Sequence, residues 1–139
     1  MSETIVLNLP EPPSVNAAYR NTAKGRAKTR SYRNWESECL WMIKGAKPGI
    51  VAGPFTVALF LSEKTRKDVD NCLKPVLDLL GKVGVTEDDS RCYGVVSTKS
   101  PDVTVGRCRI AIRPKTDDFF PFICIAERAG KAFDERETL

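Results

Sequence analysis

The stretch from Phe55 to Leu80, FTVALFLSEKTRKDVDNCLKPVLDLL, decides the fold of this chain. Residues 55–61 are apolar apart from Thr56, which predicts a strand buried on both faces. Apolar side chains then recur at the i, i+3, i+4, i+7 spacing of a helix, at Leu73, Val76, Leu77 and Leu80. Asp70 or Asn71 is expected to cap this helix, and Gly81 or Gly84 to end it. A buried strand followed by an amphipathic helix predicts a sheet with helices packed on it.

The sequence on either side of this unit extends the sheet. Alternating apolar residues in TIVLNLP predict a first strand that ends at Pro10. Ser31 is a plausible N-cap for an amphipathic helix that runs to Lys47. Residues 91–99 and 104–114 read as two strands joined in a hairpin. The fold class expected is α/β (α+β), a small mixed β-sheet with helices packed on it in a single domain.

Composition excludes several classes of function. The chain has 139 residues, of which 42% are hydrophobic and 29% charged, as in an ordinary globular domain. It contains no histidine, and its five cysteines form no C-x-x-C pair, so a Cys/His zinc site and histidine-based catalysis lose support. The cysteines are best read as reduced and mostly buried. Without a signal sequence or the roughly 20 apolar residues of a membrane span, a cytoplasmic protein is expected.

Basic residues are concentrated in one region. Residues 11–32 show neither helical nor strand periodicity and are expected to form a long loop. Between Arg20 and Lys47 the chain carries eight basic residues and two acidic ones. Phosphate neutralisation contributes much of the affinity of DNA-binding proteins, so this loop predicts a DNA-contacting arm. The expected DNA contacts are Asn16, Tyr19, Arg20, Lys24, Arg26, Lys28 and Arg30.

Acidic residues gather around the central helix. In an extended segment, Asp68 and Asp70 would point the same way, and the turn after the helix returns Asp88 or Asp89 to the same region. Carboxylates without cysteine or histidine favour Mg²⁺ or Mn²⁺, and Lys74 lies one helical turn beyond Asp70. The same residues are also compatible with a helix cap, an i, i+4 ion pair and a surface turn. Spacing alone leaves both interpretations open.

Three ordered motifs carry a family resemblance. PPSVNAAYR at 12–20, KDVDNCLKPVLDLL at 67–80 and EDDSRCYGVVSTK at 87–99 resemble the RusA-type Holliday junction resolvases. The family pattern is PPS-x-N-x-x-Y/W-R, then D-x-D-N-x-x-K-x-x-x-D-x-L, then a D-D turn that leads into a strand. The resemblance runs from about Ile5 to Pro114. It divides the chain into a RusA-like nuclease domain over residues 1–116 and an extension over 117–139.

The resemblance implies a mechanism and a set of site residues. Asp68, Asp70 and Asp89 would bind the metal, with Asp88 a weaker candidate, and Lys74 would be the catalytic lysine. Asn71 would be a structural or substrate-orienting neighbour, and Lys67 and Asn71 join the expected DNA contacts. The expected cofactor is Mg²⁺, with Mn²⁺ able to substitute.

The resemblance also implies partners and an activity. The chain would form a homodimer and nick four-way DNA junctions symmetrically, in DNA recombination and repair. Two alternatives stay open: a nuclease for flaps or other branched DNA, and a non-catalytic DNA-binding module whose acidic residues are only structural.

Overall fold

The computed structural model of this protein describes residues 4–116. The predicted extension over residues 117–139 lies outside the described part. Within residues 4–116, no helix is both long enough and apolar enough to cross a bilayer. The helices and strands are β1 (Ile5–Pro10), α1 (Val15–Ala18), β2 (Tyr19–Thr22), β3 (Gly25–Lys28), α2 (Arg30–Ala46), β4 (Phe55–Ser62), α3 (Leu73–Val83), β5 (Cys92–Ser100) and β6 (Arg107–Pro114). Two single 3-10 turns, η1 (Asp70–Cys72) and η2 (Asp89–Arg91), flank α3.

The main sheet is mixed, as predicted. Its strand order is β1-β6-β4-β5. β6 pairs antiparallel with both β1 and β4, whereas β4 and β5 are parallel. Parallel neighbours need a crossover connection, which α3 provides. The sheet and its helices confirm the predicted fold class.

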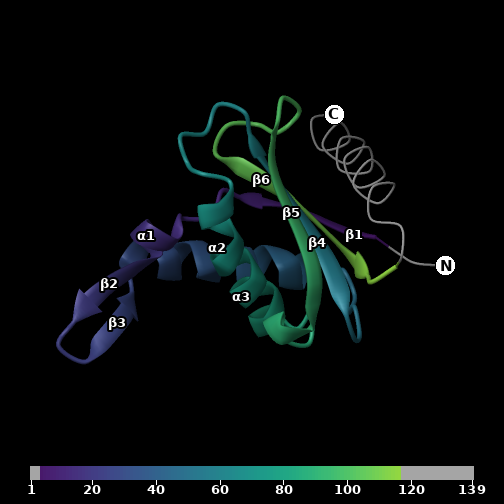
Figure 1. Ribbon diagram of the computed structural model, residues 1–139, viewed down its shortest axis with the longest axis horizontal. Coiled ribbons are helices and arrows are strands. Elements are labelled where there is room, and N and C mark those ends of the chain that lie inside the picture. The colour runs from purple at the N-terminus through teal and green to yellow at the C-terminus, as the bar shows by residue number, and fades with distance from the viewer. Residues whose placement is uncertain (1–3, 117–139) are drawn as a thin grey trace.

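Helices α2 and α3 cover one face of this sheet (Figure 1). Every residue of β4 is buried, which confirms the predicted strand with two apolar faces. Val57, Leu59 and Leu61 pack against the helices, and Phe60 packs in a smaller cluster on the opposite face. Burial of each large apolar side chain contributes roughly 1.5–3 kcal/mol. The candidate site therefore rests on a well-packed central strand.

The last two strands do not form the predicted hairpin. β5 lies on one edge of β4, and β6 lies on its other edge. The reason is the crossover through α3, which places β5 parallel to β4 at the edge of the sheet. Burial reflects this arrangement, because β6 is buried at Cys108 to Arg113 whereas every residue of β5 before Ser100 is exposed or half-buried.

Residues 11–32 do not form one long loop either. They contain the short helix α1 and an antiparallel two-stranded sheet, β2 and β3, which projects away from the main sheet (Figure 1). The Thr22 side chain organises the turn by donating to the Gly25 carbonyl at 2.6 Å and accepting from the Lys24 N–H at 3.3 Å. Gly25 has φ +111°, which favours glycine. Most residues of the two strands are polar and exposed, so they lack the apolar alternation that marks a strand.

The helix ends correct two further predictions. Thr29, and not Ser31, caps α2 by accepting a hydrogen bond from the Tyr32 N–H at 3.3 Å. α3 continues directly from η1 and has no side-chain cap. The prediction that Asp70 or Asn71 caps it is therefore wrong. Its end is predicted correctly, because Gly84 adopts the left-handed conformation with φ +85°.

The cysteines within residues 4–116 are free thiols. Cys39, Cys72 and Cys108 are buried and Cys92 is half-buried. Burial raises the pKa of the Cys39 thiol to about 12. These four thiols confirm the prediction of reduced, mostly buried cysteines, and Cys124 lies outside the described residues.

Candidate active site

Asp68 and Asp70 lie on the surface between β4 and α3, and both side chains are exposed. Val69 between them has helical backbone angles, with φ −62° and ψ −31°. The prediction that the two carboxylates point the same way assumed an extended segment, and the backbone at Val69 contradicts that assumption. Any approach of the two carboxylates to a common ion depends instead on the shape of this turn.

Contacts from distant parts of the chain hold this turn in place. The Lys67 ammonium donates to the Pro12 carbonyl at 2.8 Å. The Ser97 hydroxyl of β5 donates to the Val69 carbonyl. Cys72 of η1 is fully buried in the core. The exposed aspartates are thus carried by a segment that is anchored on both sides.

Asn71 orients Asp68. Its side-chain amide donates to Asp68 Oδ2 at 3.3 Å, and its backbone N–H donates to the Asp68 carbonyl at 3.2 Å. Of the two roles that the sequence leaves open for Asn71, these contacts support the structural one.

Lys74 joins the second and third sequence motifs. Its ammonium lies 2.9 Å from Asp89 Oδ2 and 3.0 Å from Asp78 Oδ1. Asp89 begins η2, fifteen residues further along the chain than Lys74, and Asp78 lies one turn further along α3. Asp78 fills the last acidic position of the second motif but was given no role from the sequence, although its i, i+4 spacing from Lys74 is a signal for this ion pair.

This cluster shifts the pKa values of its members. Hydrogen bonds to Asp89 and Asp78 raise the pKa of the Lys74 ammonium, which keeps it charged. The hydrogen bond from Lys74, together with a contact to Asp88, lowers the pKa of Asp89. The Lys74 ammonium therefore lies between the side chains of Asp78 and Asp89, which favour its charged form.

A shallow groove of about 300 Å³ lies beside these residues. Its lining carries four carboxylates and one ammonium group, together with Leu77 and Gly81. The charged residues are Asp78, Lys82, Glu87, Asp88 and Asp89. A DNA phosphate that entered this groove would meet mostly negative charge, so binding there requires additional positive charge.

The three predicted metal ligands are carboxylates, whose hard oxygen atoms suit Mg²⁺. Within residues 4–116, no three acidic or cysteine side chains are grouped closely enough to hold a metal ion. Asp89 instead pairs with Lys74, and Asp68 with Asn71. The donor chemistry fits the expected ion, and the assignment of Asp68, Asp70 and Asp89 as its ligands stays a prediction.

Five of the predicted DNA contacts have exposed side chains: Asn16, Arg20, Lys24, Arg26 and Arg30. Tyr19 is half-buried. Its ring packs edge-on against the ring of Tyr32, with the two ring centroids 5.5 Å apart. The Arg26 guanidinium lies over the Tyr19 ring, 4.7 Å from the ring centroid. Tyr19 therefore helps to hold the base of the hairpin formed by β2 and β3.

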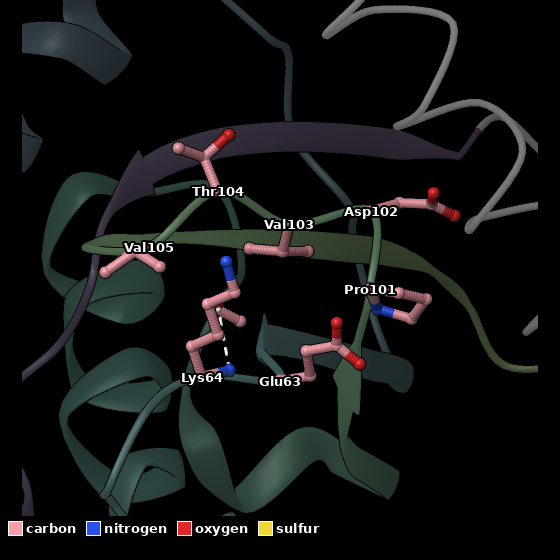
Figure 2. A pocket seen from close by; sticks show the side chains of 8 residues that line it. Glu63, Lys64, Pro101, Asp102, Val103, Thr104 and Val105 are labelled. Carbon is pink, nitrogen blue, oxygen red and sulfur yellow. Dashed lines mark hydrogen bonds between the residues drawn. The ribbon is translucent and has the colours of Figure 1, made fainter.

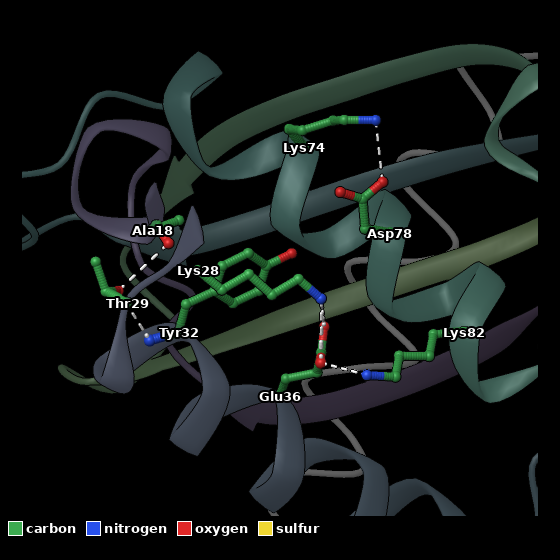
Figure 3. Close-up of polar contacts among 8 residues, drawn as sticks. All are labelled: Ala18, Lys28, Thr29, Tyr32, Glu36, Lys74, Asp78 and Lys82. Atoms are coloured by element: carbon green, nitrogen blue, oxygen red, sulfur yellow. Dashed lines mark hydrogen bonds and ion pairs between the residues drawn. The ribbon is translucent and has the colours of Figure 1, made fainter. Parts of the chain in front are cut away.

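Two further predicted DNA contacts, Lys28 and Lys67, bind distant parts of the protein. Lys28 of β3 donates to the buried Glu36 carboxylate of α2 at 3.1 Å, and Lys82 of α3 donates to the other oxygen of the same carboxylate (Figure 3). Lys67 is engaged with Pro12, as described above, and lies 3.6 Å from Glu11. These contacts join separate elements of the protein, so they support a structural role for Lys28 and Lys67. A direct contact of either lysine with DNA stays a prediction.

The helix α1 brings the N-terminal motif to the acidic residues. It contacts both η1 and α3. The exposed side chain of Asn16 therefore extends from an element that adjoins the turn carrying Asp70. The three motifs, separate in sequence, meet around the start of α3.

A second hollow of about 320 Å³ lies between the end of β4 and the β5–β6 connection (Figure 2). Its charged lining residues are Glu63, Lys64 and Asp102. None of the predicted site residues lines it, so it is not the candidate active site.

Comparison with known proteins identifies similar sequences. The family described as endodeoxyribonuclease RusA matches residues 10–113. The chain is 27% identical over 115 residues to a crossover junction endodeoxyribonuclease RusA of Aquifex aeolicus (strain VF5), covering 81% of this chain and 90% of that protein. It is 31% identical over 116 residues to proteins of that name from Escherichia coli (strain K12) and Enterobacteria phage 82, covering 78% of this chain and 93% of each relative.

Proposed function

This chain belongs to the RusA family of endodeoxyribonucleases, and we propose that it resolves four-way DNA junctions by hydrolysing phosphodiester bonds. The observation that carries this proposal is the 2.9 Å contact between Lys74 and Asp89, which unites two family motifs at the start of α3. The basic hairpin adjoins the same region through α1. Exposed acidic residues beside an exposed basic hairpin suit the hydrolysis of DNA.

We propose Mg²⁺ as the cofactor, with Mn²⁺ able to replace it, and Asp68, Asp70 and Asp89 as the ligands. When bound, such an ion activates water for attack and stabilises the departing oxygen. The acidic groove supports the need for a cation, because four carboxylates would otherwise repel the substrate phosphate.

The residues of the chain itself supply positioning and charge. Lys74 carries a permanent positive charge next to the acids, where it can neutralise charge that develops on the phosphate. Arg20, Lys24 and Arg26 on the exposed hairpin bind neighbouring phosphates, which fixes the register of the DNA. Asn71 keeps the Asp68 carboxylate in position.

We also propose that the protein acts as a homodimer in the cytoplasm of a bacterial cell. A four-way junction has two-fold symmetry, so a symmetric dimer can present its two sites to opposed strands. Paired, symmetric nicks are the expected product.

The test is cleavage of a labelled synthetic four-way junction with Mg²⁺, alongside a flap and a linear duplex. Wild type is compared with Asp70→Asn and with Glu38→Gln, which removes one exposed carboxylate of α2 away from the site. We expect paired nicks in the junction alone, lost in Asp70→Asn while DNA binding persists and retained in Glu38→Gln.

Other outcomes identify the alternatives. Preferred cutting of the flap would make the protein a nuclease for other branched DNA. Junction binding without any cutting under Mg²⁺ or Mn²⁺ would make it a structure-selective DNA-binding protein.

A further inference from the structure

The Lys74 ammonium has two carboxylate partners that differ in their position in the chain. Asp78 lies on the same helix, one turn away, whereas Asp89 belongs to the segment that follows α3. The distances are nearly equal, at 3.0 Å and 2.9 Å. Figure 3 shows the contact between the Lys74 ammonium and the Asp78 carboxylate.

The proposed function assigns different roles to the two carboxylates. Asp89 is a proposed metal ligand, and oxygen atoms that coordinate a cation hold a neighbouring ammonium less strongly, because the two positive charges repel each other. Asp78 is not among the proposed ligands and stays on the helix that carries Lys74. It can therefore keep its hydrogen bond to the ammonium when Asp89 binds the ion.

Without Asp78, the Lys74 ammonium would have no carboxylate of this pair left to bind once Asp89 coordinates the ion. Lysine has a flexible four-carbon stem, and this one is half exposed, with 53% of its side chain accessible. A free ammonium would sample many positions, and catalysis depends on holding charged groups in one geometry.

Helix stability alone gives little reason for this pair. Exposed i, i+4 pairs contribute little, and an acid that follows a lysine along a helix is the less favourable order. A purely structural pair would thus have a negligible effect on cleavage.

We propose that Asp78 is a positioning residue that holds the Lys74 ammonium at the active site when Asp89 turns to the metal ion. This inference rests on the proposed function of the same site. It assigns Asp78 no direct contact with the reacting phosphate.

The test is a double-mutant cycle in the full-length protein with Asp78→Asn, Lys74→Met and the combined variant. Glu38→Gln on α2 is the control for the loss of one carboxylate, and thermal unfolding verifies that each variant folds. Asp78→Asn is expected to lower kcat on the four-way junction about tenfold with little change in KM. In the Lys74→Met background the same substitution is expected to change kcat by less than about twofold. Asp78→Glu is expected to restore part of the lost activity.

A second readout needs no cleavage. In titration calorimetry with Mg²⁺ alone, Asp78→Asn is expected to weaken binding about threefold more when Lys74 is present than in the Lys74→Met background. The reason is that Asp89 then becomes the sole carboxylate partner of the ammonium, which makes its release to the ion harder.

The outcomes separate the two proposals. If wild type does not cut any DNA but the calorimetric coupling is observed, the nuclease proposal fails and the role of Asp78 stands. If wild type cuts the junction and Asp78→Asn acts equally with and without Lys74 in both assays, the role of Asp78 is overturned and the nuclease proposal stands. Failure of wild type to bind either Mg²⁺ or Mn²⁺, with no cleavage under either ion, overturns both.

Discussion

Lys82 of α3 donates a hydrogen bond to the buried Glu36 carboxylate of α2, although 46 residues separate them in sequence. Lys28 of β3 binds the same carboxylate from the other side. One acid thus connects the basic hairpin to the helix that carries the candidate catalytic lysine (Figure 3). The orientation of the proposed DNA-binding arm relative to the active site depends on this contact.

Replacing Glu36 is expected to loosen the hairpin. Glu36→Gln removes the negative charge that Lys28 and Lys82 share, which should lower the free energy of unfolding by about 1–2 kcal/mol. The loss is modest because both lysines are partly exposed to solvent. KM for the junction should rise more than kcat falls. Urea unfolding and cleavage kinetics check this expectation, with exposed Glu38→Gln in the same helix as the control. Equal effects of the two substitutions would contradict it.

The contribution of Glu36 is expected to depend on pH. Burial raises the pKa of this carboxyl, but hydrogen bonds from Lys82 and Lys28 outweigh burial and lower it below its ordinary value of 4.5. A lowered pKa means that the stabilisation is present above the unfolded value and is lost as the pH falls through the folded one. The difference in unfolding free energy between wild type and Glu36→Gln should therefore be full at pH 7 and shrink below pH 4.5. A difference that stays constant on acidification would refute this.

Exposed hairpin residues are expected to control the salt dependence of DNA binding. Arg20→Ala combined with Lys24→Ala should reduce the slope of log affinity against log salt by about 2, because each phosphate contact contributes about 1. Lys44→Ala, an exposed residue in the last turn of α2, is the matched control and should leave the slope unchanged. Binding assays across a range of salt concentrations measure the slopes. A slope unaffected by the hairpin substitutions would place the DNA elsewhere.

The two tryptophans provide a test of the core. Trp35 is buried, and its indole N–H donates to the Pro10 carbonyl at 2.9 Å, whereas Trp41 is 82% exposed. Trp35→Phe should cost about 1 kcal/mol through loss of this hydrogen bond, and Trp41→Phe should cost almost nothing. Thermal unfolding of the two variants makes the comparison, and similar melting temperatures would show that the link between α2 and β1 contributes no stability.

Elements with strong periodicity could be predicted from the sequence. The strand at β4 and the helix at α3 are both marked by apolar side chains that recur with the period of their secondary structure. The hairpin of β2 and β3 could not be predicted in this way, because its side chains are mostly solvent-exposed and carry no apolar pattern. Thr22 and Gly25, which form its turn, were the available signal.

The candidate site could be predicted in part. The spacing of the motifs grouped Asp68 and Asp70 with Lys74 and with Asp88 or Asp89, and the family resemblance favoured Asp89. The fold places Lys74 against Asp89. The partners of Lys28 and Lys67 could not be read from the sequence. Lys67 binds the carbonyl of Pro12, which is distant along the chain. Lys28 binds Glu36, and this contact depends on how α2 packs. The role inferred for Asp78 also needed the structure, which shows one ammonium between two carboxylates.

By itself, the sequence determined the strand and helix with strong apolar periodicity, β4 and α3, together with the family motifs, because these depend on the order and spacing of side chains along the chain. Only the tertiary structure decided that β5 and β6 lie on opposite edges of β4, and that Glu36 connects the hairpin to α3. Sheet order follows from a crossover that local patterns do not encode. A buried carboxylate finds its partners only when packing brings distant segments together and desolvation makes an unpaired charge costly.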